Sequence, residues 1–64
     1  MKVNGSIITL GESKSLYDFL KDQNYDITRI AVERNGEIVP KLMYKSIMLN
    51  YDDTIEVVTF VGGG

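Results

Sequence analysis

The sequence predicts an α+β fold, in which one mixed β-sheet of about five strands carries a single helix on one face. Two features predict it. One is a pair of Asn-Gly turns, Asn4-Gly5 and Asn35-Gly36, each between short runs that favour strands. The other is a helical segment between the two turns, followed near the C-terminus by a run of β-branched and aromatic residues. A chain of 64 residues is expected to form one small domain.

The N-terminal residues predict a β-hairpin. Its strands are Lys2-Val3 and a segment from Ser6 to Leu10. Between them, Asn4-Gly5 supplies two residues that tolerate the positive φ of a type I′ turn.

The best helical segment follows this hairpin. Its apolar residues recur at i, i+3 and i+4 on one helical face, and we expect them in the core: Leu16, Phe19 and Leu20. Ser15 is the expected N-cap, with Asp18 three residues later as a weak capping box, and Ser13 is the alternative cap. The helix is expected to end at Asn24 or at Tyr25-Asp26.

A second hairpin is predicted around Asn35-Gly36. Residues 27–34 and 37–39 are its expected strands, and Pro40 limits the second strand to an edge or an end of the sheet. Residues 41–49 fit neither the helical nor the strand period. We expect them to form an irregular connection with a turn of helix that plugs the core.

The segment from Thr54 to Val61 is the strongest strand prediction, since nearly every residue in it is β-branched or aromatic. Alternation places one set of side chains on one face: Ile55, Val57, Thr59 and Val61. Val58 and Phe60 lie on the other face with Glu56, and two interpretations of them stay open. They are a candidate docking patch for a partner, or they complete a second part of the core.

The missing residue types limit the chemistry of the chain. It has no Cys and no His, which excludes a disulfide, a thiolate zinc site, a thiol nucleophile and an imidazole base. A self-contained enzyme is therefore not expected, and neither is a metal site. The lack of disulfides suits a reducing compartment, so we expect a cytoplasmic protein that is a monomer when free.

The negative net charge of the chain disfavours partners that are themselves strongly negative. The net charge is −2 and the sequence pI is about 4.8, so neither nucleic acid nor an anionic membrane is a favoured partner. No apolar run approaches the ~20 residues that span a bilayer. Asp52, Asp53 and Glu56 are grouped in and after the turn that precedes the last strand. We interpret this group as a solvated turn rather than a site for a cation or a basic partner.

The order of elements and several motifs together resemble a known family. The motifs are Val3-Asn4-Gly5, the stretch Ala31-Val32-Glu33-Arg34-Asn35-Gly36-Glu37-Ile38-Val39-Pro40-Lys41, Leu49, Asp53, Ile55-Glu56-Val57-Val58 and the terminal glycines. They resemble the β-grasp (ubiquitin-like) fold and, more narrowly, the ThiS family of sulfur carriers in thiamin biosynthesis. Three positions depart from the family pattern. Asp52 stands where Gly is usual, Lys41 where Arg is common, and three glycines where two are usual.

The resemblance implies a protein cosubstrate rather than an enzyme. In such a carrier an E1-like enzyme of the ThiF type would use ATP and Mg to adenylate the carboxylate of Gly64. Sulfur from a cysteine desulfurase would convert the adenylate to a thiocarboxylate, and a thiazole synthase of the ThiG type would accept the sulfur. The chain itself would bind no cofactor. Residues 1–61 would form the folded domain and residues 62–64 a flexible tail, with Val61, Gly62 and Gly63 threading a channel in the partner.

Other functions share parts of this pattern. The chain could be the small subunit of a molybdopterin synthase or another small β-grasp sulfur carrier. It could also be a ubiquitin-like modifier, whose Gly64 ends on a lysine of a target protein. A TGS-type interaction module would use the fold without any chemistry at the terminal glycines.

Overall fold

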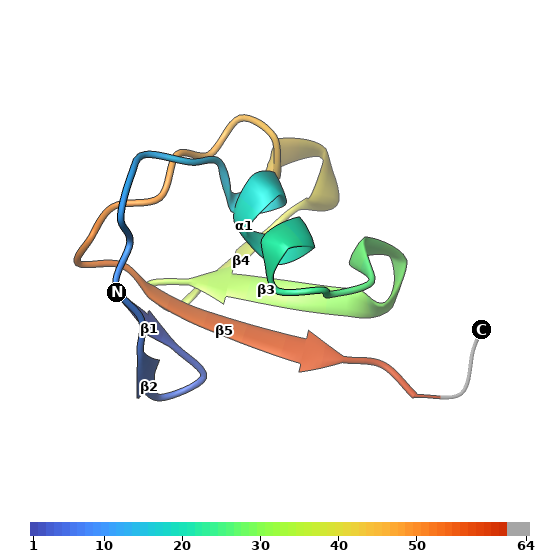
Figure 1. Ribbon diagram of the computed structural model, residues 1–64. Helices are drawn as coiled ribbons and strands as arrows, with labels where there is room; N and C mark the ends of the chain where they lie inside the picture. The colour runs from blue at the N-terminus through green and yellow to red at the C-terminus, as the bar shows by residue number, and fades with distance from the viewer. Residues whose placement is uncertain (62–64) are drawn as a thin grey trace.

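The computed structural model describes residues 1–61, in which five strands form one mixed sheet in the order β2-β1-β5-β3-β4. Helix α1 lies across one face of this sheet (Figure 1). Strand β5 is central, because it pairs in parallel with β1 and antiparallel with β3. The strands are β1 (Lys2–Val3), β2 (Ser6–Ile7), β3 (Ile30–Arg34), β4 (Glu37–Val39) and β5 (Thr54–Thr59), and the helical segments are α1 (Leu16–Asp22), η1 (Ile27–Arg29) and η2 (Lys41–Met43). The α+β fold predicted from the sequence is confirmed.

Both Asn-Gly turns adopt the predicted backbone. Asn4 and Gly5 have φ of 50° and 84°, and Asn35 and Gly36 have φ of 52° and 85°. These are the two positive φ angles of a type I′ turn. Strand β2 ends at Ile7 rather than at the predicted Leu10, because its partner β1 has only two residues with which to pair.

Helix α1 begins where the sequence predicts. Ser15 is its N-cap, and the Asp18 amide donates to the Ser15 hydroxyl at 3.0 Å. The helix ends at Asp22, slightly before the predicted position, and Asn24 follows with a φ of 64°. The predicted core face is confirmed, since three of its residues are buried against the sheet: Leu16, Phe19 and Leu20.

The segment from Ile27 to Arg29 is not part of a strand, and the prediction of a strand over residues 27–34 is wrong at its start. It forms the 3₁₀ turn η1, because the Asp26 carboxylate accepts from both the amide and the hydroxyl of Thr28, at 3.0 and 2.6 Å. This local capping competes with a sheet ladder. Strand β3 therefore begins at Ile30.

The irregular connection after Pro40 plugs the core as predicted. It contains the 3₁₀ turn η2, and the side chains of Tyr44 and Leu49 are buried. It also supplies hydrogen-bond acceptors to the first amides of helix α1, which have no partner inside the helix. The Leu16 amide donates to the Ile47 carbonyl at 2.8 Å, and the Tyr17 amide donates to the Tyr44 carbonyl at 2.9 Å.

Asp53 does not lie in a solvated turn, and that interpretation of the acidic group is wrong for this residue. Its side chain is only 3% exposed, whereas Asp52 and Glu56 are exposed. Its carboxylate accepts from Arg34 Nε and Asn35 Nδ2, each at 3.0 Å, and from the Asn50 amide at 2.9 Å. A buried carboxylate needs such donors. The spacing of the acidic residues alone gave no sign of this burial, because Arg34 and Asn35 come from a distant hairpin.

The two turn asparagines extend the sheet with their side chains. Asn4 Oδ1 accepts from the Val57 amide at 2.7 Å, so it adds one rung to the ladder between β1 and β5. Asn35 Oδ1 accepts from the Thr54 amide at 2.9 Å, and the backbone amide of Asn35 donates to the Thr54 carbonyl at 2.8 Å. Both hairpin turns are thereby tied to the central strand.

Replacement of Asp53 by Asn should lower the free energy of unfolding by about 2–4 kcal/mol, because it removes the buried charge that Arg34 pairs with and turns one acceptor into a donor. Urea unfolding followed by circular dichroism measures this loss. Asp52→Asn is the matched control, since Asp52 is exposed and adjacent. Equal effects of the two variants would contradict the role given to Asp53.

The same contribution should depend on pH. Burial by itself raises the pKa of Asp53, but hydrogen bonds from Asn50, Asn35 and Arg34 outweigh burial and hold the pKa below its ordinary 3.8. The stabilisation is therefore complete above that ordinary value and is lost as the pH falls through the lowered native pKa. The difference in unfolding free energy between wild type and Asp53→Asn should be constant near neutral pH and shrink in strong acid.

Candidate functional site

The outer face of strand β5, which points away from helix α1, carries the candidate docking patch. Ile55 and Val57 are buried under the helix, whereas Val58 is 56% exposed and Phe60 is 54% exposed. Val58 and Phe60 therefore do not complete the core in the described chain. Thr59 and Val61 were predicted to share a face with Ile55 and Val57, but unlike those two they are exposed, because the layer of helix and loop covers β5 only as far as Val57.

The end of β5 leads directly to the terminal glycines. Thr59 pairs with Ile30, and the Phe60 amide donates to the Arg29 carbonyl at 2.7 Å. Val61 is 94% exposed. Phe60 is thus held to the sheet at the end opposite the N-terminus (Figure 1). Gly62, Gly63 and Gly64 lie outside the described residues.

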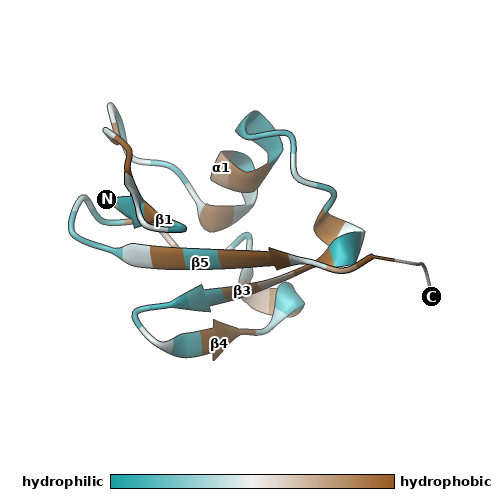
Figure 2. Ribbon diagram, turned by 90° about the horizontal axis from the view of Figure 1, so that it is seen from below, coloured by the Kyte–Doolittle hydropathy of each residue, from teal (hydrophilic) through white to brown (hydrophobic). Residues whose placement is uncertain are grey.

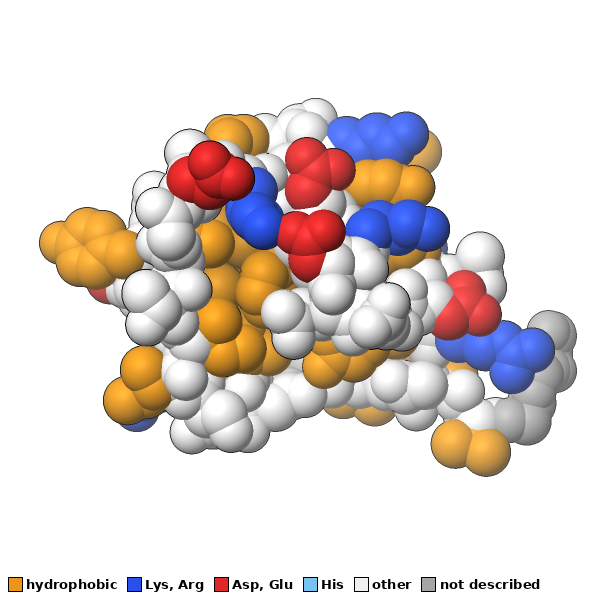
Figure 3. Space-filling view, in the orientation of Figure 1, with side chains coloured by type: hydrophobic (Ala, Val, Ile, Leu, Met, Phe, Trp, Pro, Cys, Tyr) orange, Lys and Arg blue, Asp and Glu red, His pale blue; other side chains and the backbone are white. Residues whose placement is uncertain are grey.

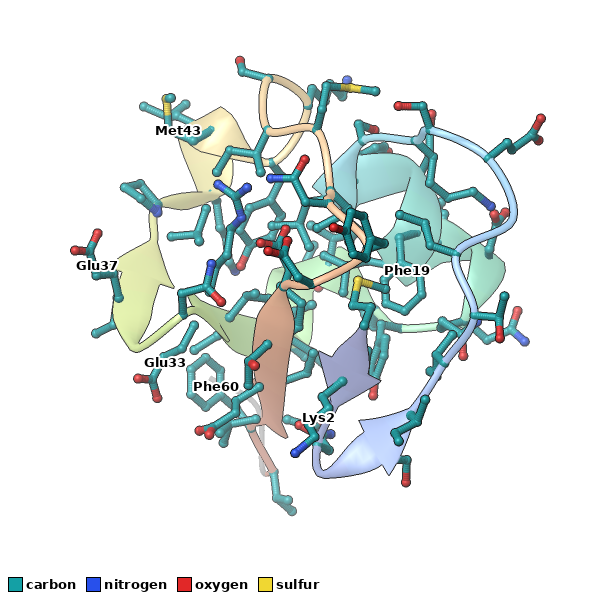
Figure 4. All side chains as sticks on the ribbon, turned by 90° about the vertical axis from the view of Figure 1, so that its left-hand side faces the viewer. Lys2, Phe19, Glu33, Glu37, Met43 and Phe60 are labelled. Atoms are coloured by element: carbon teal, nitrogen blue, oxygen red, sulfur yellow. The ribbon has the colours of Figure 1, made fainter. Side chains whose placement is uncertain are left out.

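The register places further side chains beside this patch. Ala31 lies opposite Val58 and Glu33 lies opposite Glu56 on the neighbouring strand β3. On β4, Ile38 lies opposite Glu33 and is 76% exposed. Figure 4 shows Glu33 and Phe60 on the side of the sheet away from Phe19, which belongs to helix α1. We define the outer sheet surface as these residues: Ala31, Glu33, Ile38, Glu56, Val58 and Phe60.

The helical side of the molecule carries charged side chains of both signs, unlike the outer sheet surface. Figure 3 shows acidic and basic side chains together over the helical layer. Lys14 forms an ion pair with Asp22 there, and the Lys45 ammonium lies 4.8 Å from the centre of the Tyr17 ring. Hydrogen bonding to Asp22 raises the pKa of Lys14. By contrast, strand β5 carries a single charged residue, Glu56, among apolar residues and threonines (Figure 2).

Within residues 1–61, no three acidic side chains come close enough together to hold a metal ion. No helix in the same range is long and apolar enough to cross a membrane. Sequence reasoning singled out Val58 and Phe60 but missed Glu33, whose place beside Glu56 follows only from the pairing of β3 with β5.

A central strand with parallel and antiparallel neighbours, crossed by one helix, defines a β-grasp protein of the ubiquitin-like class. Among solved structures, the thiamine biosynthesis protein ThiS of Geobacter metallireducens superposes with a TM-score of 0.79 at 27% identity, over 98% of this chain and 96% of that one. The model of the ThiS family matches residues 1–64. The chain belongs to the ThiS family.

Relatives of known sequence agree with this placement. The sulfur carrier protein ThiS of Bacillus subtilis is 38% identical over 53 residues, which cover 83% of this chain and 80% of that protein. A thiazole synthase of Paramagnetospirillum magneticum is 39% identical over 62 residues, or 97% of this chain. This chain spans only 19% of the length of that synthase.

Replacement of Phe60 by Asp should leave the fold intact and change the free energy of unfolding by less than about 1 kcal/mol, because the side chain is half exposed. Val57→Asp is the matched comparison on the same strand. It should unfold the domain, since it would place an unpaired charge among buried residues. Thermal melts of both variants test the assignment, and unfolding of Phe60→Asp would contradict it.

Proposed function

We propose that this protein is the sulfur carrier of thiamin biosynthesis, and that its Gly64 carboxylate carries the sulfur as a thiocarboxylate. Membership of the ThiS family is the observation that carries this proposal. The geometry supports it, because Val58 and Phe60 are exposed at the end of the strand that precedes the terminal glycines. The protein acts as a cosubstrate, since it is modified and regenerated in each cycle.

The chemistry needs an activating partner. A free α-carboxylate has a pKa near 3.5, so it is ionised and unreactive at neutral pH. The chain has no Cys or His to activate it. An E1-like enzyme of the ThiF type binds ATP and Mg, and a Gly64 carboxylate oxygen attacks the α-phosphorus of ATP, which releases pyrophosphate. A persulfide sulfur supplied by a cysteine desulfurase then displaces AMP from the acyl carbon, and reduction of the resulting acyl disulfide by a thiol leaves the thiocarboxylate.

Glycine is the residue that this delivery requires. Without a Cβ atom, Gly62 and Gly63 let the backbone pass close to the walls of a partner channel. Three extended residues reach about 10 Å, which allows Gly64 to enter a buried nucleotide site while Val61 stays at the channel mouth. Ordering these residues costs about 1–2 kcal/mol each. The folded domain must offset that cost by docking, and Val58 and Phe60 are the proposed contacts.

The thiazole synthase is the proposed acceptor of the sulfur. The synthase of Paramagnetospirillum magneticum contains a segment similar to this whole chain, although the chain covers a fifth of its length. Such a chain joins a carrier-like segment to an enzyme named for making thiazole. This supports a partnership between the present chain and a separate thiazole synthase of the ThiG type.

Alkylation after activation tests the proposal. The chain is incubated with a ThiF-type enzyme, ATP, Mg and a desulfurase with cysteine, and is then treated with iodoacetamide and measured by intact mass. Because the chain contains no Cys, a single label that fragmentation places at Gly64 identifies a thiocarboxylate. A variant that lacks Gly63 and Gly64 should fold normally and take no label.

Two results would contradict the proposal. Absence of any label with an enzyme that is active on another carrier would exclude the thiocarboxylate. Transfer of Gly64 to lysines of other proteins, seen as bands of higher mass on denaturing gels, would indicate a ubiquitin-like modifier instead.

A further inference from the structure

Two glutamates occupy directly opposite positions in the outer sheet surface. Glu33 on β3 is directly opposite Glu56 on β5. Side chains directly opposite on neighbouring antiparallel strands have Cβ atoms about 5 Å apart, and like charges at this spacing destabilise a sheet. Neither glutamate is buried, since Glu33 is partly exposed and Glu56 is exposed.

Three of the other seven acidic residues form ion pairs. Asp22 pairs with Lys14, Asp26 with Arg29, and Asp53 with Arg34. Within the described part of the chain, neither Glu33 nor Glu56 forms an ion pair. Lys2 lies on the same side of the sheet (Figure 4), but by register it is next to Thr54, and it contacts neither glutamate as an ion pair.

Exposed apolar side chains flank the pair. Val58 and Phe60 follow Glu56 along β5, and Ile38 flanks Glu33 from β4. A partner that covers these apolar side chains would also strip water from the two carboxylates. Burying unpaired charges is costly, so the partner must supply a positive group at that point.

The charge of the surface decides between possible occupants. A second copy of this chain placed face to face would bring four carboxylates together, which disfavours a homodimer. An anionic membrane or a nucleic acid would be repelled for the same reason. The occupant that fits is a protein surface with apolar side chains around one basic residue.

We propose that the adenylating enzyme inserts one Arg or Lys between Glu33 and Glu56, and that this contact sets the position of the sheet on the enzyme. The inference rests on the proposed function and adds the chemistry of the partner surface. An arginine suits the site well, since its planar group donates to two carboxylates at once. The same contact lies on the strand that continues to Gly64, so it fixes where the glycines enter the enzyme.

The double variant Glu33→Gln with Glu56→Gln tests this inference. It should melt at a higher temperature than wild type, because the like-charge repulsion is gone. The KM of the adenylating enzyme for it should rise roughly 10- to 100-fold, with kcat at saturation unchanged. The double variant Glu12→Gln with Glu37→Gln is the matched control. It removes the same charge from exposed positions outside the outer sheet surface, and its KM should stay close to that of wild type.

Three results overturn the inference. An unchanged KM for the first variant excludes the contact, and equal increases for both double variants show that only net charge matters. A lower melting temperature for the first variant shows that the two glutamates stabilise the fold instead. Each variant is compared with wild-type protein that is labelled at Gly64 by iodoacetamide after activation. If the wild type is not labelled, that result contradicts the proposed function and not this inference alone.

Discussion

The central strand β5 is held in place by side chains as well as by backbone, and the fold depends on that arrangement. Asn4 and Asn35 bond its amides at Val57 and Thr54, and Asp53 gathers donors from the second hairpin and the preceding loop. A domain of about 60 residues buries a smaller share of its surface than larger domains do and is marginally stable. A few buried polar contacts at the start of β5 therefore carry an unusually large part of its stability.

This arrangement lets a single strand serve both the core and the outside. Toward α1, β5 contributes Ile55 and Val57 to the core, and toward solvent it shows Val58 and Phe60. Its start is fixed by Asp53, and its end is fixed by the bond from Phe60 to Arg29. The last fixed residue is thus only two positions before the first terminal glycine. A carrier needs this combination, because a partner that binds the sheet thereby fixes the position at which the terminal glycines begin.

Much of this fold could be predicted from local sequence signals. The turns at Asn4-Gly5 and Asn35-Gly36, the cap at Ser15 and the core face of α1 follow from short-range rules that tertiary contacts did not override. The 3₁₀ turn η1 was missed because its β-branched residues predict a strand, whereas the cap from the Asp26 side chain favours the turn. The burial of Asp53 and the pairing of Glu33 with Glu56 could not be found, since both depend on contacts between segments about twenty residues apart. The family resemblance singled out Gly64, whereas Val58 and Phe60 needed the structure to show that they are exposed.

The central claim is that the outer face of β3 and β5, and not the helix, meets the adenylating enzyme. Transferred cross-saturation from unlabelled enzyme to the labelled chain measures this contact directly, residue by residue. We predict the largest loss of amide signal at residues of β3 and β5 and at Gly62 to Gly64, with little change along α1. Loss of signal concentrated on α1 and the segment after Pro40, with β5 unaffected, would contradict the account.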